Sequence, residues 1–463
     1  MNNILPENAY SSSLAELPEG LLYMADLGEE DGLFFAGEHC PISGGAQVKP
    51  GLYRLPLDHE TARQLWNLLP WTAPRQVLRE ERTIGTGDRL GIATLGHIRA
   101  VEGFDVLPVL AQQSMRELTL MGNTYDTVLD RVTFQVFQAG YRQGYGADGD
   151  HLKTAEEIRM AIGCGVSMIT LDCSEHIHCE RTSAPLTLEL EERYLRQPLQ
   201  LPGTSLHFTK ETLAQAQAVF RDAVGFAIQI YRDCIQGKPV DLEISMDETD
   251  QSTTPEQHFF VANELRLAGV EFCTMAPRFY GEFQKGIDYI GDLSRFRQDA
   301  AAHAAIARHF SYKLSIHSGS DKFSVFPILG ELTGERFHAK TSGTSWLEAL
   351  RIVAGEDRML FREIYRYAQE VFQECSRYYH VSTYLSMVPD LSTIEDAQLP
   401  ELLSQDASRQ LLHITYGKIL GCPEFRRRLY HLWRNAREEY ASLLDAHIGR
   451  HLALLCPNHR KNG

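Results

Sequence analysis

A repeated strand-then-helix pattern is the feature of this 463-residue chain that most restricts its fold. Between about residues 88 and 345, short apolar runs recur, and each ends in polar or glycine-rich sequence before a helix-like segment. The runs lie at 89–97, 105–114, 144–154, 166–176, 239–249, 270–279, 312–323 and 336–345. Eight such units over about 250 residues are typical of a (β/α)₈ barrel.

An open, doubly wound α/β sheet is the alternative fold, and it would be expected to begin with a glycine-rich nucleotide turn. Neither GxGxxG nor GxxxxGK[ST] occurs in the sequence. We therefore predict an α/β protein of the TIM-barrel type that needs no nicotinamide nucleotide. The expected organisation is an α+β amino-terminal extension (1–85), a catalytic barrel (86–346) and a carboxy-terminal helical extension (347–463).

Composition excludes several classes of partner. The formal net charge of −16 argues against nucleic acid, whose phosphates require clustered cations. The sequence has no uninterrupted apolar run of about 18 residues, and its amino terminus lacks the pattern of a secretory signal. Nine scattered cysteines without a CxxC pair favour reduced thiols and a cytoplasmic location.

Reacting groups in such barrels lie at the carboxyl ends of the strands and in the loops that follow. In this sequence those positions carry carboxylates, imidazoles and cations. The candidates are Gln112, Gln113, Asp150, His151, Lys153, Asp172, Glu243, Asp247, Arg278, His317, Asp321, Lys322, His338, Lys340, Thr341 and Ser342.

Alternation of side chains along a strand narrows this set to a candidate metal site. Glu243, His317 and His338 are expected to point toward a common axis from three strands. One carboxylate and two imidazoles suit Zn²⁺ or another first-row divalent ion. The alternative is that each histidine is a hydrogen-bonded residue of the core or the rim.

Four other candidates have two possible roles each. Asp150 and Asp172 are either acid/base groups or caps of the following helices. Lys322 and Arg278 either bind an anionic part of the substrate or pair with carboxylates of the same ring.

The stretch LDCSEHIHCE (171–180) looks like a small metal-binding cluster. Its C-x₂-H-x-H-C spacing matches no usual zinc pattern, because structural zinc sites draw paired ligands from two separated knuckles. We expect Asp172, at the end of the fourth strand, to matter more than the cysteines that follow it.

Long blocks of the sequence resemble the tagaturonate epimerase family over roughly residues 85–350. They include GYGADGDHLKT, GEFQKGIDYIGD, SIHSGSDKFSVFP and HAKTSGTSWLEALR. The resemblance implies a divalent-metal-dependent enzyme that interconverts tagaturonate and fructuronate in hexuronate catabolism. The matching blocks contain Asp150, His151, Lys153, Glu243, Asp247, His317, Asp321, Lys322, His338, Lys340 and Thr341.

That reaction inverts a carbon β to the ketone, whose C–H proton the carbonyl does not acidify. We therefore expect retro-aldol cleavage and re-addition, with Zn, Mn or Ni stabilising the enediolate fragment. Asp150 and Asp172 are the expected acid/base pair, assisted by Lys153 or Lys340. The expected substrate-binding residues are Gln112, Gln113, Arg278, Asp321, Lys322 and Thr341.

Two other functions remain open at this point. The same barrel and metal would serve an epimerase or isomerase of neutral ketoses such as tagatose and fructose. A non-catalytic sugar-acid-binding protein would keep the fold without the chemistry. In every case the expected partner is a small molecule, and the chain is a candidate homo-oligomer.

Overall fold

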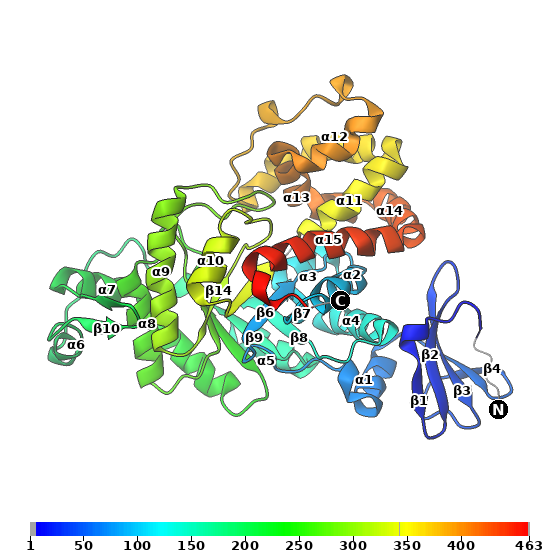
Figure 1. Ribbon diagram of the computed structural model, residues 1–463, viewed down its shortest axis with the longest axis horizontal. Coiled ribbons are helices and arrows are strands. Elements are labelled where there is room, and N and C mark those ends of the chain that lie inside the picture. Colours follow the sequence, from blue (N-terminus) through cyan, green and yellow to red (C-terminus); the bar gives the residue numbers. More distant parts are fainter. Residues whose placement is uncertain (1–5, 342, 462–463) are drawn as a thin grey trace.

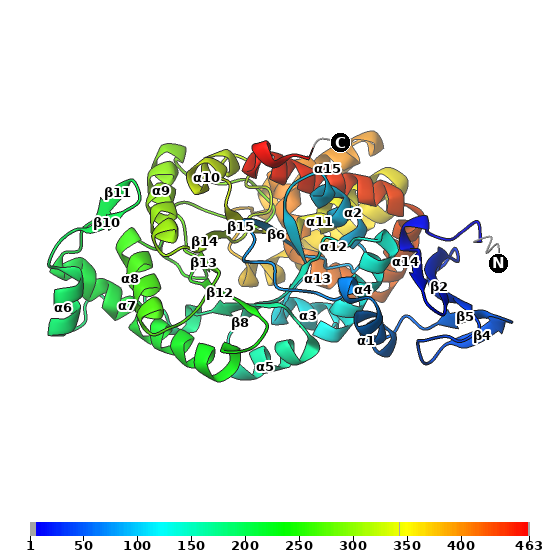
Figure 2. The same ribbon diagram turned by 60° about the horizontal axis from the view of Figure 1, so that its bottom comes forward.

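Eight parallel strands close into a barrel in the computed structural model, which describes residues 6–341 and 343–461. The strands follow one another around the ring as β12-β13-β14-β15-β6-β7-β8-β9. Figure 2 labels β12 to β15, β6 and β8 of this ring. Their bounds are β6 Arg82–Thr86, β7 Leu107–Ser114, β8 Gly146–Leu152, β9 Met168–Asp172, β12 Asp241–Ser245, β13 Thr274–Ala276, β14 Lys313–Ile316 and β15 Phe337–Thr341. The predicted TIM-type barrel is confirmed.

The first strand lies earlier in the chain than the apolar pattern predicts. The run at 89–97 forms a loop and the start of helix α2 (Thr94–Glu102), whereas β6 is Arg82–Thr86. The side chain of Asp88 explains the loop, because it accepts hydrogen bonds from the backbone N–H groups of Leu90, Gly91 and Ala93. The expected boundary of the barrel at residue 86 therefore falls at the end of its first strand.

Helices surround the barrel and are fixed by caps at their amino ends. Threonine residues 124, 154, 209 and 254 each close a capping box in front of a barrel helix, which satisfies backbone donors left free at the helix start. The helices are α3 Met115–Met121, α4 Tyr125–Ala139, α5 Ala155–Cys164, α7 Lys210–Ile230, α8 Pro255–Leu267, α9 Leu293–His309, α10 Phe326–Thr333 and α11 Thr344–Glu356.

Two smaller elements lie at opposite ends of the molecule (Figure 1). One is an antiparallel sheet of strands β1 Ala15–Leu17, β2 Gly20–Asp26, β3 Asp31–Gly37, β5 Leu52–Leu55 and β4 Ala46–Lys49, followed by α1 His59–Leu68. The other is an insertion after β9, with α6 Leu188–Tyr194 and the hairpin β10 Leu199–Leu201 and β11 Thr204–Leu206. The sheet packs its apolar face on Phe134 and Phe137 of α4.

The carboxy-terminal region is helical and continuous with the barrel. It contains α12 Arg358–Cys375, α13 Asp406–Gly421, α14 Pro423–Asn435 and α15 Arg437–Leu455. Helix α15 lies against α2 and α10 of the barrel, and α12 to α14 build a second apolar core with α11 (Figure 1). Among the helices of the described residues, none is long and apolar enough to cross a membrane.

Candidate active site

Two adjoining pockets open at the carboxyl end of the barrel. The first, here called the inner pocket, has a volume of about 350 Å³ and is lined by Asp150, Asp172, Lys340 and neighbouring residues. The second, the outer pocket, has a volume of about 330 Å³ and lies between Arg278, Phe283 and the segment 378–380. His317 lines both pockets, so it marks their junction.

Lys340, near the end of β15, is the charged centre of the inner pocket. Its Nζ atom lies 2.8 Å from Asp148, 2.5 Å from Asp150 and 3.2 Å from Glu243. Burial disfavours the charged amine, but these carboxylates hold the pKa of Lys340 well above its ordinary value. Lys340 is therefore a permanent cation and not a proton acceptor.

The carboxylates around Lys340 differ in their protonation. Burial raises the pKa of Asp148 to about 6, although Lys340 opposes the shift. Burial also acts on Asp150, but Lys340 and His151 outweigh it and lower the pKa of Asp150 to about 2. Asp150 is thus an ionised group that faces the pocket from β8 at neutral pH.

His317 follows β14 and lies between two carboxylates. Its Nε2 atom is 2.7 Å from Oε1 of Glu243, and its Nδ1 atom is 2.8 Å from Oδ1 of Asp247. Burial disfavours the imidazolium, but Asp247 and Glu243 together raise the pKa of His317 to about 10. The sequence expectation that Glu243 and His317 meet therefore agrees with their positions.

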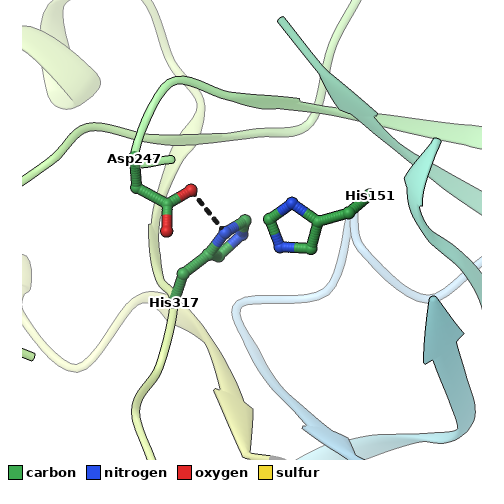
Figure 3. Close-up of side chains that lie close together, drawn as sticks. All are labelled: His151, Asp247 and His317. Carbon is green, nitrogen blue, oxygen red and sulfur yellow. Dashed lines mark ion pairs between the residues drawn. The ribbon is translucent and has the colours of Figure 1, made fainter. Parts of the chain in front are cut away.

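His151 approaches His317 from the opposite side of the pocket. Their ring centroids are 5.0 Å apart, and Asp247 lies beyond His317 (Figure 3). His151, Asp247 and His317 each offer a ligand atom, and these atoms all lie within 4.8 Å of one another. This group, here called the pocket cluster, has the donor set of a first-row divalent metal site.

The Nδ1 atoms of both histidines in the pocket cluster are buried and lie against carboxylates. Nδ1 of His317 is 2.8 Å from Oδ1 of Asp247, which is itself a member of the cluster. Nδ1 of His151 is 3.4 Å from Oδ2 of Asp172. A carboxylate behind an imidazole is the usual support for a ligating histidine, because it fixes the orientation of the ring.

His338, the third residue of the expected metal site, lies away from both pockets. It precedes Lys340 by two residues in β15, which places it one layer deeper in the barrel. Its Nδ1 atom is 2.9 Å from Oγ1 of Thr83, and neither pocket is lined by it. Burial lowers the pKa of His338 to about 3, so the ring is neutral.

Besides Asp150, Asp172 and Lys340, three further expected substrate-binding or catalytic residues line the pockets. Gln112 and Lys153 line the inner pocket, and Lys153 lies 3.8 Å from Asp172 and 3.3 Å from Glu175. Arg278 lines the outer pocket, where its guanidinium group donates to the backbone carbonyl of Thr249.

The remaining expected substrate-binding residues make contacts within the protein and line neither of these pockets. Lys322 is fully buried and donates to the carbonyl groups of Gln284, Ile287 and Ser320. Gln113 donates to the carbonyl of Asp88, Thr341 donates to that of Gly85, and Asp321 pairs with Arg409. Ser342 lies outside the described residues.

Sequence reasoning did not single out two of the basic residues that line both pockets. Arg116 is the second residue of α3, and Lys285 belongs to the loop between β13 and α9. Asp247 and His151 were candidates without a metal role. Arg116 and Lys285 lie outside the strands, so the alternation of side chains along a strand gives no direction for them.

The cysteine- and histidine-rich stretch after β9 forms no metal group within the part of the chain that the structure describes. Cys173 is buried, His176 stacks on Phe226 with ring centroids 4.1 Å apart, and all nine cysteines are free. Only Asp172 of this stretch lines the inner pocket.

Comparisons with known proteins agree with this architecture. The profile of the family described as UxaE, tagaturonate epimerase, matches residues 10–455. The tagaturonate/fructuronate epimerase of Thermotoga maritima is 41% identical over 412 residues, which cover 86% of this chain and 85% of that protein.

Two crystal structures of the fructuronate-tagaturonate epimerase of Cohnella laeviribosi, one native and one with glycerol, each superpose with a TM-score of 0.93 at 44% identity. The superpositions cover 97% of this chain for the glycerol complex, 96% for the native form, and 96% of the crystallised chain in both. The chain therefore belongs to the tagaturonate epimerase family.

Proposed function

We propose that this epimerase interconverts tagaturonate and fructuronate at the inner pocket, with a divalent metal ion held by His151, Asp247 and His317. Membership of the family supports the substrate pair. The observation that carries the metal is the pocket cluster itself, whose donor atoms lie within 4.8 Å of one another beside the acidic residues around Lys340.

The charge balance of the inner pocket favours a cation. Four carboxylates, from Asp148, Asp150, Glu243 and Asp247, surround Lys340 and His317, so the negative groups outnumber these two cations. Buried carboxylates in excess of cations are costly unless a further positive charge compensates them. When bound, a divalent ion acts as a Lewis acid that stabilises negative charge on the ketone oxygen.

Asp150 is the proposed base for the inverting hydroxyl group. Lys340 keeps its carboxylate ionised, so Asp150 can accept the O–H proton as the neighbouring C–C bond breaks. The bonding electrons pass to the ketone-bearing fragment, and the other fragment becomes an aldehyde. After the aldehyde rotates, the bond forms again on its other face and a proton returns to the oxygen.

Asp172 is proposed to act on the same reaction through His151. Its carboxylate lies 3.4 Å from Nδ1 of His151 and accepts a hydrogen bond from the backbone N–H of Ser174. The bond from Ser174 fixes the carboxylate of Asp172, and this carboxylate in turn orients the imidazole ring of His151 toward His317. Lys153, which lies 3.8 Å from Asp172, balances the charge of that carboxylate at the edge of the pocket.

Metal analysis tests the proposed function. We expect the purified protein to contain about one divalent ion per chain and to lose tagaturonate turnover on chelation, with recovery when the ion returns. His151→Gln and Asp247→Asn should lose both the ion and activity. His447→Gln is the matched control, because it alters a second histidine-carboxylate group outside both pockets. Full turnover after complete chelation contradicts the proposal.

Isotope exchange tests the bond-breaking step. Retro-aldol cleavage leaves the hydrogen on the inverted carbon in place, so the product formed in D₂O should carry no deuterium there. Three-carbon fragments should be trapped during turnover. Stoichiometric deuterium at the inverted carbon would favour direct proton exchange instead.

A further inference from the structure

Not every cation that lines the inner pocket has a carboxylate partner. Five basic side chains line it: Arg89, Arg116, Lys153, Lys285 and Lys340. A pocket that processes a sugar acid needs at least one positive group free for the carboxylate of the substrate. The partner of each cation decides which of them is free.

Three of the five cations have protein carboxylates as partners. Lys340 is surrounded by Asp148, Asp150 and Glu243, as described above. Nε of Arg89 lies 3.0 Å from Oε1 of Glu117, and both side chains are buried. Lys153 pairs with Asp172 and Glu175.

Arg116 and Lys285 have no carboxylate within 4.0 Å among the described residues, and both line the inner and the outer pocket. Nζ of Lys285 donates to Oγ of Ser318 at 3.0 Å, which leaves further N–H donors for a ligand. The guanidinium group of Arg116 lies 4.7 Å from the ring centroid of Tyr379. A guanidinium group that rests its face on an aromatic ring keeps its N–H edge available.

We propose that Arg116 and Lys285 bind the carboxylate group of the sugar-acid substrate and so determine the preference for uronates over neutral ketoses. This inference rests on the proposed function for the substrate class. It assigns the specificity to one residue of α3 and one of the loop after β13, with Tyr379 of the carboxy-terminal helical region supporting Arg116.

The position of the two cations also orients the substrate. Asp150 lines only the inner pocket and repels an anionic group, whereas Arg116 and Lys285 attract it to the side that adjoins the outer pocket. The hydroxyl-bearing carbons are then directed toward Asp150. Arg278, the other cation of the outer pocket, instead donates to backbone carbonyl groups of its own loop.

Steady-state kinetics with a charged and an uncharged substrate test the proposal. For Arg116→Gln and Lys285→Gln we expect the KM for tagaturonate to rise about 10- to 100-fold, as for the loss of a charge-assisted hydrogen bond, with kcat within about fivefold. The kcat/KM for tagatose should stay within about threefold of the wild-type value or increase. Arg116→Lys and Lys285→Arg should retain most of the affinity for tagaturonate.

Lys238→Gln is the matched charge control. Lys238 is exposed in the turn before β12, lines a separate pocket, and has no carboxylate partner among the described residues. Removing its charge should leave both substrates unaffected. An effect equal to that of Lys285→Gln would mean that net charge, and not a local contact, sets the KM.

Three outcomes overturn the inference. They are an unchanged KM for tagaturonate in both neutral variants, a fall in kcat without a change in KM, and equal losses on tagaturonate and tagatose. If the wild-type enzyme does not turn over tagatose, the KM for tagaturonate alone tests the inference. Metal content separates this test from the proposed function, because Arg116→Gln and Lys285→Gln should keep the ion even where their KM rises.

Discussion

Two groups in this molecule have the same composition, two imidazoles and one carboxylate, and differ in what surrounds them. The pocket cluster contains His151, Asp247 and His317, and His317 lines both pockets. The second group, here called the helix cluster, contains Asp321, His447 and His451, and its atoms are equally close. The helix cluster lines neither pocket, so its access to a ligand differs.

The partners of each group explain the difference in expected role. In the helix cluster Arg409 pairs with Asp321, and Nε2 of His451 accepts the backbone N–H of Asp321 at 2.9 Å. Nδ1 of His451 donates to the carbonyl of His447. Arg409 thus already compensates the carboxylate of the helix cluster, whereas Asp247 of the pocket cluster pairs with no arginine or lysine among the described residues. Residue types alone do not identify a metal site; the charges around them and their access to a pocket also matter.

The largest expected effect compares one histidine from each cluster. His317→Gln should lower kcat/KM for tagaturonate by about 1,000-fold or more, because loss of a Lewis-acid site removes several kcal/mol of stabilisation. His451→Gln should stay within about tenfold of the wild type. Steady-state kinetics at saturating metal measures both. Equal losses would mean that the two clusters do not differ as described.

The second prediction concerns the free energy of unfolding, to which we expect the helix cluster to contribute more than an exposed ion pair does. Asp321→Asn leaves Arg409 largely buried without its ion-pair partner, so the free energy of unfolding should fall by about 3 kcal/mol or more. Asp396→Asn breaks the Arg362–Asp396 pair, in which Asp396 is 54% exposed, and should cost less than about 1 kcal/mol. Urea denaturation followed by circular dichroism gives both values, and similar costs would contradict a structural role for the helix cluster.

The third prediction compares the carboxylates behind the histidines. Asp172 lies 3.4 Å from Nδ1 of His151, and Glu348 lies 3.8 Å from Nδ1 of His447. Asp172→Asn should weaken metal binding by about 10- to 100-fold, as is usual for a carboxylate that supports a ligating histidine. Glu348→Gln should leave the metal affinity within about twofold. Competition with a chelator measures both, and an intact affinity in Asp172→Asn would separate Asp172 from the ion.

The barrel could be predicted from the sequence because seven of its strands lie within the predicted runs, each of which ends in polar or glycine-rich sequence. The first strand was missed because RTIGT contains a single large apolar residue, whereas LGIATL nearby looks like a strand. In the structure Ile84 and its neighbours are buried by the closed ring and not by their own hydrophobicity. A strand of this kind is visible only when its partners β7 and β15 are in place.

The site residues could be predicted only where they lie on strands whose side chains alternate regularly between the two faces. Glu243 lies on a regular strand, and the structure places it 2.7 Å from His317, one of the two histidines expected beside it. His151 and Ser318 have φ angles of 53° and 48°, and such left-handed positions turn a side chain away from the direction that alternation predicts. The helix cluster joins residues that are 130 positions apart, which no local pattern indicates.

The smallest expected effect is the pH dependence of the helix cluster. Burial acts to raise the pKa of Asp321, but His447, Arg409, His451 and Lys322 outweigh it and lower the pKa below its ordinary value. A carboxyl group with a lowered folded-state pKa stabilises the protein above its unfolded-state value of about 3.9, and this contribution is lost as pH falls through the folded-state pKa. The difference in unfolding free energy between wild type and Asp321→Asn should therefore be constant from pH 5 upward to neutral pH and shrink below about pH 4. Urea denaturation at several pH values measures it. A difference that stays constant in acid would show that packing, and not the charge of Asp321, makes the helix cluster stable.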